Sequence, residues 1–149
     1  MQQSAGQPVP WLPKTHVVVP VDFSDESMKA VDTALELVES PSRVHVIHVL
    51  PILAATEPGV IWDTVDDDSR QDHAEEALRR RLADEHYAGI DIVISIGNPG
   101  QEIAAFAEST QAELIVMPSH GRTGFSRLLI GSVAERVVRL AHCPVLVLK

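Results

Sequence analysis

The sequence has little of what several protein classes require. It contains one cysteine, Cys143, so no disulfide can form within the chain. Its 12 Lys and Arg stand against 21 Asp and Glu, giving a net charge of −9, and general nucleic-acid binding needs many cations to neutralise phosphates. It lacks an apolar run of about 18 residues, the length of a membrane-spanning helix, and it lacks a basic N-terminal region typical of a signal peptide. We therefore expect a cytoplasmic protein with no nucleic-acid and no membrane partner.

The remaining composition is that of a globular protein. Hydrophobic residues make up 45% and charged residues 22% of the chain, which argues against disorder. A length of 149 residues fits one domain with an ordinary hydrophobic core. We expect residues 1–14, with three prolines, to form an irregular tail and residues 15–149 to form a single domain.

Apolar segments of strand length alternate along the chain with segments of helical periodicity. Strands are predicted at residues 16–21, 43–50, 91–96, 114–117 and 144–148. Helices are predicted from the Ser24 cap to the exit at Pro41, over about 66–86, from Asn98–Pro99 to about 110, and along Val133–Ala141. Five strands joined by helical crossovers indicate an α/β fold, a five-stranded doubly wound parallel sheet with four helices in an open three-layer sandwich.

A glycine-rich segment after the fourth predicted strand is a candidate anion site. It reads Ser119-His120-Gly121-Arg122-Thr123-Gly124, and Gly131-Ser132 follows at the start of the last helix. No acidic residue occurs from Pro118 to Ala134, in a chain that is otherwise acidic. Glycines let backbone N–H groups approach an anion, and a helix N-terminus adds partial positive charge. A surface loop with a capped helix is the simpler alternative.

The turn after the first strand has the opposite character. It has no glycine and carries Asp22, Asp25 and Glu26, whose charges repel a phosphate, so it is neither a Rossmann fingerprint nor a P-loop. In open α/β sheets ligands lie beyond the carboxyl ends of the strands, where the winding reverses. If the first and fourth strands are neighbours there, Asp22 faces the glycine loop and is suited to a ribose hydroxyl, an adenine amine or a cation.

These residues together resemble the universal stress protein family. The resemblance rests on Pro20-Val21-Asp22, the run from Ser119 to Ser132, and the ending Cys143-Pro144-Val145-Leu146-Val147, and it covers roughly residues 14–149. Nucleotide-binding members of that family carry Gly, two residues, Gly, nine residues, then Gly-Ser or Gly-Thr. Gly121, the nine residues 122–130 and Gly131-Ser132 match this spacing, but Pro118 occupies the place of the first glycine.

The resemblance implies a strand order of 3-2-1-4-5 and an ATP site, with Mg²⁺ as a candidate companion ion. Val21, Asp22 and Val49 would border the adenine and ribose, and Gly121, Gly131 and Ser132 would hold the phosphates. Proline has no N–H to donate, so Pro118 either narrows this pocket or substitutes through its carbonyl and turn geometry. The other candidate cofactor-binding residues are Pro20, Met117, Ser119, His120, Arg122, Gly124 and Val133.

Several of these residues have structural alternatives. Ser132 with Glu135 three residues later has the spacing of a capping box. His120 can touch a phosphate or stabilise its loop, and Arg122 can reach a phosphate or a surface carboxylate. His45 and His48 lie three apart on a strand, hence on opposite faces, and cannot share a metal. We identify no catalytic residue and no metal ligand.

Three functions remain open at this level. The first is an ATP-binding stress-response or signalling module in which the nucleotide modulates contacts with a second copy or an unknown protein partner. The others are a slow ATPase and a dimeric interaction protein that binds no nucleotide. Under the expected strand order the last strand is an apolar sheet edge, which proteins usually cover, charge or pair. We therefore expect a homodimer through Val145 and Val147, unless the proline-rich tail folds back over this edge.

Overall fold

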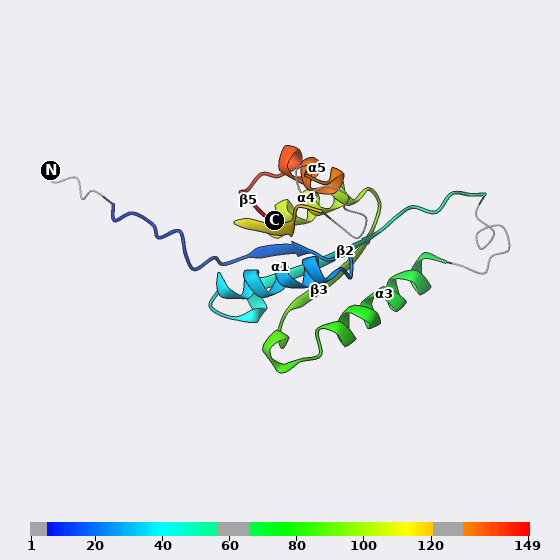
Figure 1. Ribbon diagram of the computed structural model, residues 1–149, viewed down its shortest axis with the longest axis horizontal. Helices are drawn as coiled ribbons and strands as arrows, with labels where there is room; N and C mark the ends of the chain where they lie inside the picture. The colour runs from blue at the N-terminus through cyan, green and yellow to red at the C-terminus, as the bar shows by residue number, and fades with distance from the viewer. Residues whose placement is uncertain (1–5, 57–65, 121–129) are drawn as a thin grey trace.

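The computed structural model describes residues 6–56, 66–120 and 130–149. One parallel sheet runs through the molecule in the order β3-β2-β1-β4-β5 (Figure 1). Its strands are β1 (Val17–Pro20), β2 (Val44–Leu50), β3 (Asp91–Ile96), β4 (Leu114–Pro118) and β5 (Val145–Leu148). The doubly wound sheet and its predicted order are confirmed.

Helices cover both faces of the sheet. The described residues form four α-helices, α1 (Asp25–Glu36), α3 (Asp67–Arg81), α4 (Pro99–Ser109) and α5 (Ser132–Leu140), and two short 3-10 helices, η1 (Pro41–Arg43) and η2 (Glu85–Tyr87). Helices α1 and α3 lie on one face, and α4 and α5 lie on the other (Figure 1). This is the predicted α/β arrangement with four helices.

The core follows from the alternation of side chains along the strands. Val17 and Val19 of β1 face α1 and α3, whereas Val18 faces α4 and α5, and all three are fully buried. Strand β2 divides in the same way, with Val46 on the first face and Ile47 on the second. A parallel strand covered on both faces is apolar along its length, as β1 is, whereas β2 also carries His45 and His48.

Two predicted boundaries are wrong. The helix predicted over about 66–86 ends at Arg81, because the Asp84 side chain accepts a hydrogen bond from the backbone of His86 and begins the separate η2 turn. The first helix ends at Glu36, before η1 begins at Pro41. The hydrophobic periodicity continues past both helix ends, but the Asp84 side chain and Pro41 each start a new short turn there.

Residues 6–14 of the N-terminal segment run away from the sheet and not over β5 (Figure 1). Its last residue, Lys14, is anchored, because the Lys14 amide donates to the Leu37 carbonyl at 2.8 Å and the residue bridges Val38. The Lys14 ammonium lies 3.2 Å from the centre of the Trp11 ring, a cation–π contact. The Leu12–Pro13 peptide bond is cis.

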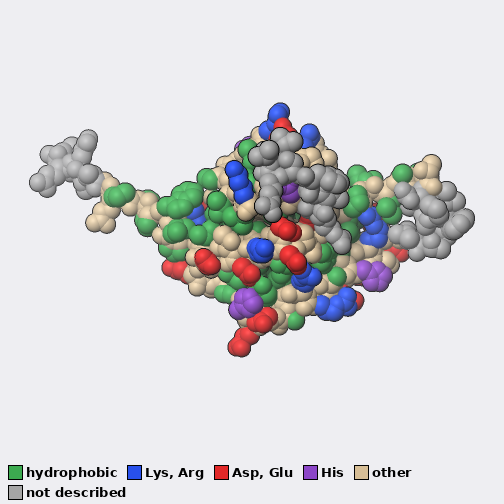
Figure 2. All heavy atoms as spheres, in the orientation of Figure 1, with side chains coloured by type: hydrophobic (Ala, Val, Ile, Leu, Met, Phe, Trp, Pro, Cys, Tyr) green, Lys and Arg blue, Asp and Glu red, His purple; other side chains and the backbone are tan. Residues whose placement is uncertain are grey.

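The surface charge is mixed on the face that carries α1 and α3. Figure 2 shows acidic and basic side chains interspersed there, and exposed ion pairs such as Arg79–Glu75 and Arg81–Asp25 join them. Such pairs each contribute little to stability. Among the described residues, none of the helices combines the length and the apolar character needed to cross a bilayer.

Candidate functional site

The predicted site residues that the structure describes meet at the carboxyl-terminal edge of the sheet. Strands β1 and β4 are neighbours, and the winding of the chain reverses between them, so this is the place where ligands bind in such sheets. The edge carries Pro20, Val21 and Asp22 after β1, Val49 near the end of β2, Met117, Ser119 and His120 at the end of β4, and Gly131, Ser132 and Val133 at the start of α5. Gly121, Arg122 and Gly124 lie outside the described residues.

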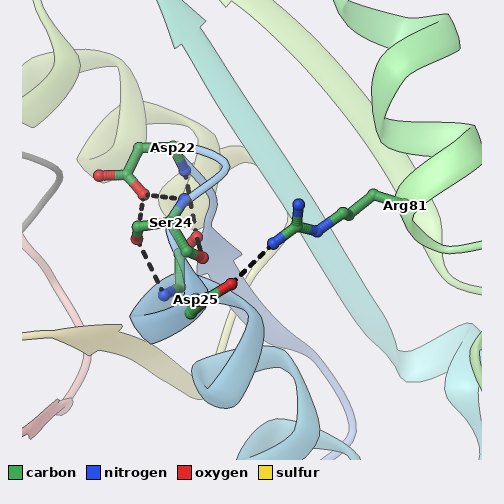
Figure 3. A network of polar contacts seen from close by, with 5 residues as sticks. Asp22, Ser24, Asp25 and Arg81 are labelled. Carbon is green, nitrogen blue, oxygen red and sulfur yellow. Dashed lines mark hydrogen bonds and ion pairs between the residues drawn. The ribbon is translucent and has the colours of Figure 1, made fainter.

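A hydrogen-bonded turn holds Asp22 (Figure 3). One carboxylate oxygen of Asp22 accepts from the Ser24 backbone N–H at 3.0 Å and from the Ser24 hydroxyl. The Ser24 oxygen in turn accepts from the Ser27 amide at 3.1 Å and caps α1. Ser27, which is 1% exposed, donates its hydroxyl to the Ser24 carbonyl and accepts from the Asp22 amide. The Asp22 carboxylate is therefore fixed in position by local contacts.

Val21 is fixed by two hydrogen bonds to β2, one to its backbone and one from a side chain. Its amide donates to the Ile47 carbonyl at 2.8 Å, and its carbonyl accepts from Nδ1 of His48 at 2.6 Å. The His48 ring also contacts Phe23 edge-on, and Phe23 has a positive φ of 66°. A non-glycine residue in this region is uncommon and needs such support.

Sequence reasoning missed the roles of His48 and Ser27. The only available signal for His48 was its strand alternation, which does place it on the α1 side. Its ring lies against Phe23, and that of His45 lies against Phe106 of α4. This confirms that the two histidines occupy opposite faces of the sheet.

The other side of the site is a close approach between the end of β4 and the start of α5. The Gly131 amide donates to the Ser119 carbonyl at 2.6 Å, and the Ser119 amide donates to the Leu148 carbonyl of β5 at 2.7 Å. A Cβ atom added at Gly131 would lie 2.9 Å from the Ser119 carbonyl oxygen. Only a glycine fits this contact without displacement of the backbone.

The structural alternative for Ser132, a capping box with Glu135, is wrong. Helix α5 begins at Ser132 itself, and Gly131 is the N-cap residue. Glu135 pairs with Arg139 at 2.8 Å. The helix starts one residue earlier than the motif requires, because the Gly131–Ser119 bond holds Gly131 in an extended conformation, with φ −66° and ψ 158°, at the N-cap position.

Within the described part of the chain, helix α5 consequently has no side-chain cap at its start. Side chains of Ser24, Asp66 and Asn98 accept amide hydrogens at the starts of α1, α3 and α4, but Gly131 has no side chain to do so. The first amides of such a helix are available to an external acceptor. Nδ1 of His120 forms a hydrogen bond with the Ser119 hydroxyl at 3.1 Å. Of the two roles open for His120, contact with a phosphate or stabilisation of its loop, this bond corresponds to the second.

Apolar side chains line the sheet below this edge. Met117 is 4% exposed, and Val49 packs half-buried against the same cluster on the α4 and α5 side. In the three described ranges no group of three or more His, Cys, Asp or Glu residues is arranged to hold a metal ion. The site thus combines a fixed carboxylate, an apolar surface and an uncapped helix start.

Comparison with known proteins identifies the family. The universal stress protein family matches residues 14–149. The chain is 38% identical over 139 residues to universal stress protein MJ0531 of Methanocaldococcus jannaschii, covering 89% of this chain and 81% of the relative.

Solved structures agree with this result. Universal stress protein UspA from Lactobacillus plantarum superposes with a TM-score of 0.70 at 26% identity, covering 91% of this chain and 97% of that one. The universal stress protein from Archaeoglobus fulgidus in complex with dAMP superposes with a TM-score of 0.53 at 25% identity, covering 93% and 100%. Residues 14–149 therefore make this chain a member of the universal stress protein family.

Proposed function

We propose that the chain binds an adenine nucleotide, ATP with Mg²⁺, at the carboxyl-terminal edge between β1 and β4. The observation that carries this proposal is the uncapped start of α5, held against Ser119 by Gly131 and placed across the switch point from Asp22. A phosphate is the natural acceptor for such amides. The dAMP bound to the A. fulgidus relative supports an adenine nucleotide as the ligand class.

Different parts of the nucleotide then lie at the two sides of the edge. The phosphates lie at Gly131, Ser132 and Val133, with Gly121 of the adjoining segment, because amides and a helix start favour anions. The ribose and base lie toward Asp22 and Val49, where a carboxylate and an apolar surface suit hydroxyls and a flat ring. Asp22 is kept away from the phosphates by this arrangement, which avoids like-charge repulsion.

We further propose that the nucleotide modulates a homodimer formed through β5. This strand is the sheet edge, and Leu146 is 38% exposed between the half-buried Val145 and Val147. An exposed apolar edge strand favours pairing with a second copy. Ser119 connects the two sites, because its carbonyl accepts from Gly131 and its amide donates to Leu148 of β5. Ligand binding at Gly131 is thereby transmitted to the edge strand and to any protein bound there.

One observation favours a second candidate function. Pro118 ends β4 where the nucleotide-binding motif has a glycine, and a proline there supplies no N–H. The alternative is a dimeric interaction protein of the same fold that binds no nucleotide.

The two functions are separated by direct ligand measurements. Mass spectrometry of small molecules released from the purified, denatured protein should detect an adenine nucleotide. Calorimetric titration of the emptied protein should show ATP binding that strengthens with Mg²⁺ and exceeds GTP binding. Light scattering with and without ATP tests the dimer. Absence of retained nucleotide together with absence of binding heat at millimolar ATP would leave the interaction protein as the function.

A further inference from the structure

The pairing between β1 and β4 stops before either strand ends. Its register comprises Val17 with Leu114 and Val18 with Ile115. On their other sides the same strands stay paired to their last residues, Pro20 with Ile47 of β2 and Pro118 with Leu148 of β5. We call the unpaired β1–β4 segment beyond Val18 and Ile115 the interrupted ladder. It lies at the ligand edge of the sheet.

The directions of the neighbouring amides explain the interruption. On β4, the amides of Ile115 and Ser119 donate to carbonyls of the β5 side. Amide directions alternate along a strand, so the nitrogen of Pro118 faces β1. On the other strand the Val21 amide donates to Ile47 of β2, so the nitrogen of Pro20 faces β4.

Both nitrogens that should continue the ladder thus belong to proline. With the register of Val18 opposite Ile115, the next two bonds would run from residue 20 to the Val116 carbonyl and from residue 118 to the Pro20 carbonyl. Proline has no N–H, so neither bond can form. The absence of an N–H donor at two adjacent positions of the ladder therefore ends the pairing at this point.

The interrupted ladder is consequently lined by acceptors. The carbonyls of Val116 and Pro20 face across it without the donors that the register assigns to them, and Val116 is 0% exposed. Buried carbonyls in folded proteins nearly always accept a hydrogen bond. A segment that offers acceptors and no ladder N–H suits hydroxyl groups of a ligand and disfavours phosphate.

We propose that Pro20 and Pro118 are positioning residues that keep the ends of β1 and β4 unpaired and present the Pro20 and Val116 carbonyls to the ribose hydroxyls of the nucleotide. The identity of the ligand rests on the proposed function, whereas the role of the prolines in the ladder does not. Pro118 then determines the specificity for ribose hydroxyls. Because it has no backbone N–H, it leaves the Pro20 carbonyl free to accept from the ligand.

The ladder part is tested in the ligand-free protein by restoring the donors. In Pro118→Ala the new amide should bond to Pro20, giving an NMR scalar coupling between the backbone nitrogen at position 118 and the Pro20 carbonyl carbon and exchange at least tenfold slower than in exposed amides. In Pro20→Ala the new amide should couple to the Val116 carbonyl in the same way. Pro99→Ala, at the first position of α4, is the matched control because that amide has no ladder partner, and it should show no such coupling. Folded variants at positions 20 and 118 without coupling, and with fast exchange, would overturn the role of the prolines.

The ribose part is tested by calorimetry with ATP and 2′,3′-dideoxy-ATP. The wild-type protein should prefer ATP by at least tenfold, because only ATP carries the hydroxyl donors. In Pro118→Ala this preference should fall at least threefold, since the new amide occupies the Pro20 carbonyl, and dideoxy-ATP affinity should change less than twofold. Equal wild-type affinity for the two ligands would refute the ribose assignment. Binding of neither ligand would refute the proposed function and the ribose assignment, while the NMR measurement still decides the role of the prolines.

Discussion

Replacing Gly131 with alanine tests the close approach that positions the start of α5. The backbone of Gly131 has φ −66° and ψ 158°, which alanine adopts without strain. The new Cβ, however, would lie 2.9 Å from the Ser119 carbonyl oxygen, whereas ordinary contacts are 3.4–4 Å. The carbonyl belongs to the backbone and must move by about 0.5 Å, which weakens the Gly131–Ser119 hydrogen bond.

The magnitude follows from these two effects. Overpacking of this kind lowers the free energy of unfolding by about 1–3 kcal/mol. Replacing glycine raises it by about 0.4–1 kcal/mol, because alanine reduces the conformational entropy of the unfolded chain. We expect Gly131→Ala to lower the free energy of unfolding by about 1–2 kcal/mol in urea denaturation. ATP affinity should fall at least tenfold, because the first amides of α5 are displaced. The larger substitution Gly131→Val should abolish binding while the domain stays folded. The valine side chain would clash with the Ser119 carbonyl as well as with the ligand.

Gly6→Ala is the control. A Cβ added at Gly6 would have no other atom within 4 Å. Gly6 is exposed, so stability should change by less than about 0.5 kcal/mol and ATP affinity should be unchanged. If Gly131→Ala matched the wild-type protein in both stability and ATP affinity, the close approach between Gly131 and Ser119 would have no functional role.

Three further predictions concern other parts of the molecule. Asp22→Ala should weaken ATP and ADP equally if the carboxylate contacts ribose or base, and Asp22→Asn, which keeps the acceptor for Ser24, separates loss of charge from loss of the turn; unchanged calorimetric affinities with and without Mg²⁺ would exclude Asp22 from the site. The double variant Val145→Lys, Val147→Lys should give a folded monomer by light scattering and circular dichroism, and a monomeric wild-type protein at tens of micromolar would contradict the dimer. Tyr87 is the single tyrosine, and burial, followed by its hydrogen bond to Asp32, raises the pKa of Tyr87 to about 12. Its ultraviolet titration should therefore have a midpoint near 12, lower in Asp32→Asn. The stabilisation associated with this shift is complete below the unfolded pKa of about 10, and it is lost as the pH rises through the pKa of the folded protein. A wild-type midpoint near 10 would refute the contact between Tyr87 and Asp32.

The sequence by itself determined the elements and their order. Val17–Val19 and Leu114–Val116 are apolar at every position, and Ser24 and Asn98 cap helices through side chains only three residues from their partners. These signals are local, since strand and helix periodicity and capping depend on neighbours within one or two turns. The family motif likewise depends on spacing alone, so Asp22 and Gly131 could be predicted as site residues before any geometry was known.

Only the tertiary structure decided how these residues are held. The position of the α5 cap depends on the Gly131–Ser119 bond, and the support of Val21 depends on His48, 27 residues away. The effect of Pro118 was ambiguous in the sequence, because a missing N–H has consequences only when the strand that it faces is known. The register of β1 against β4 supplies that strand and makes the Pro20 carbonyl the acceptor that the nitrogen of residue 118 would face. Contacts between residues distant in the chain depend on the packing of the whole sheet, and no local pattern encodes them.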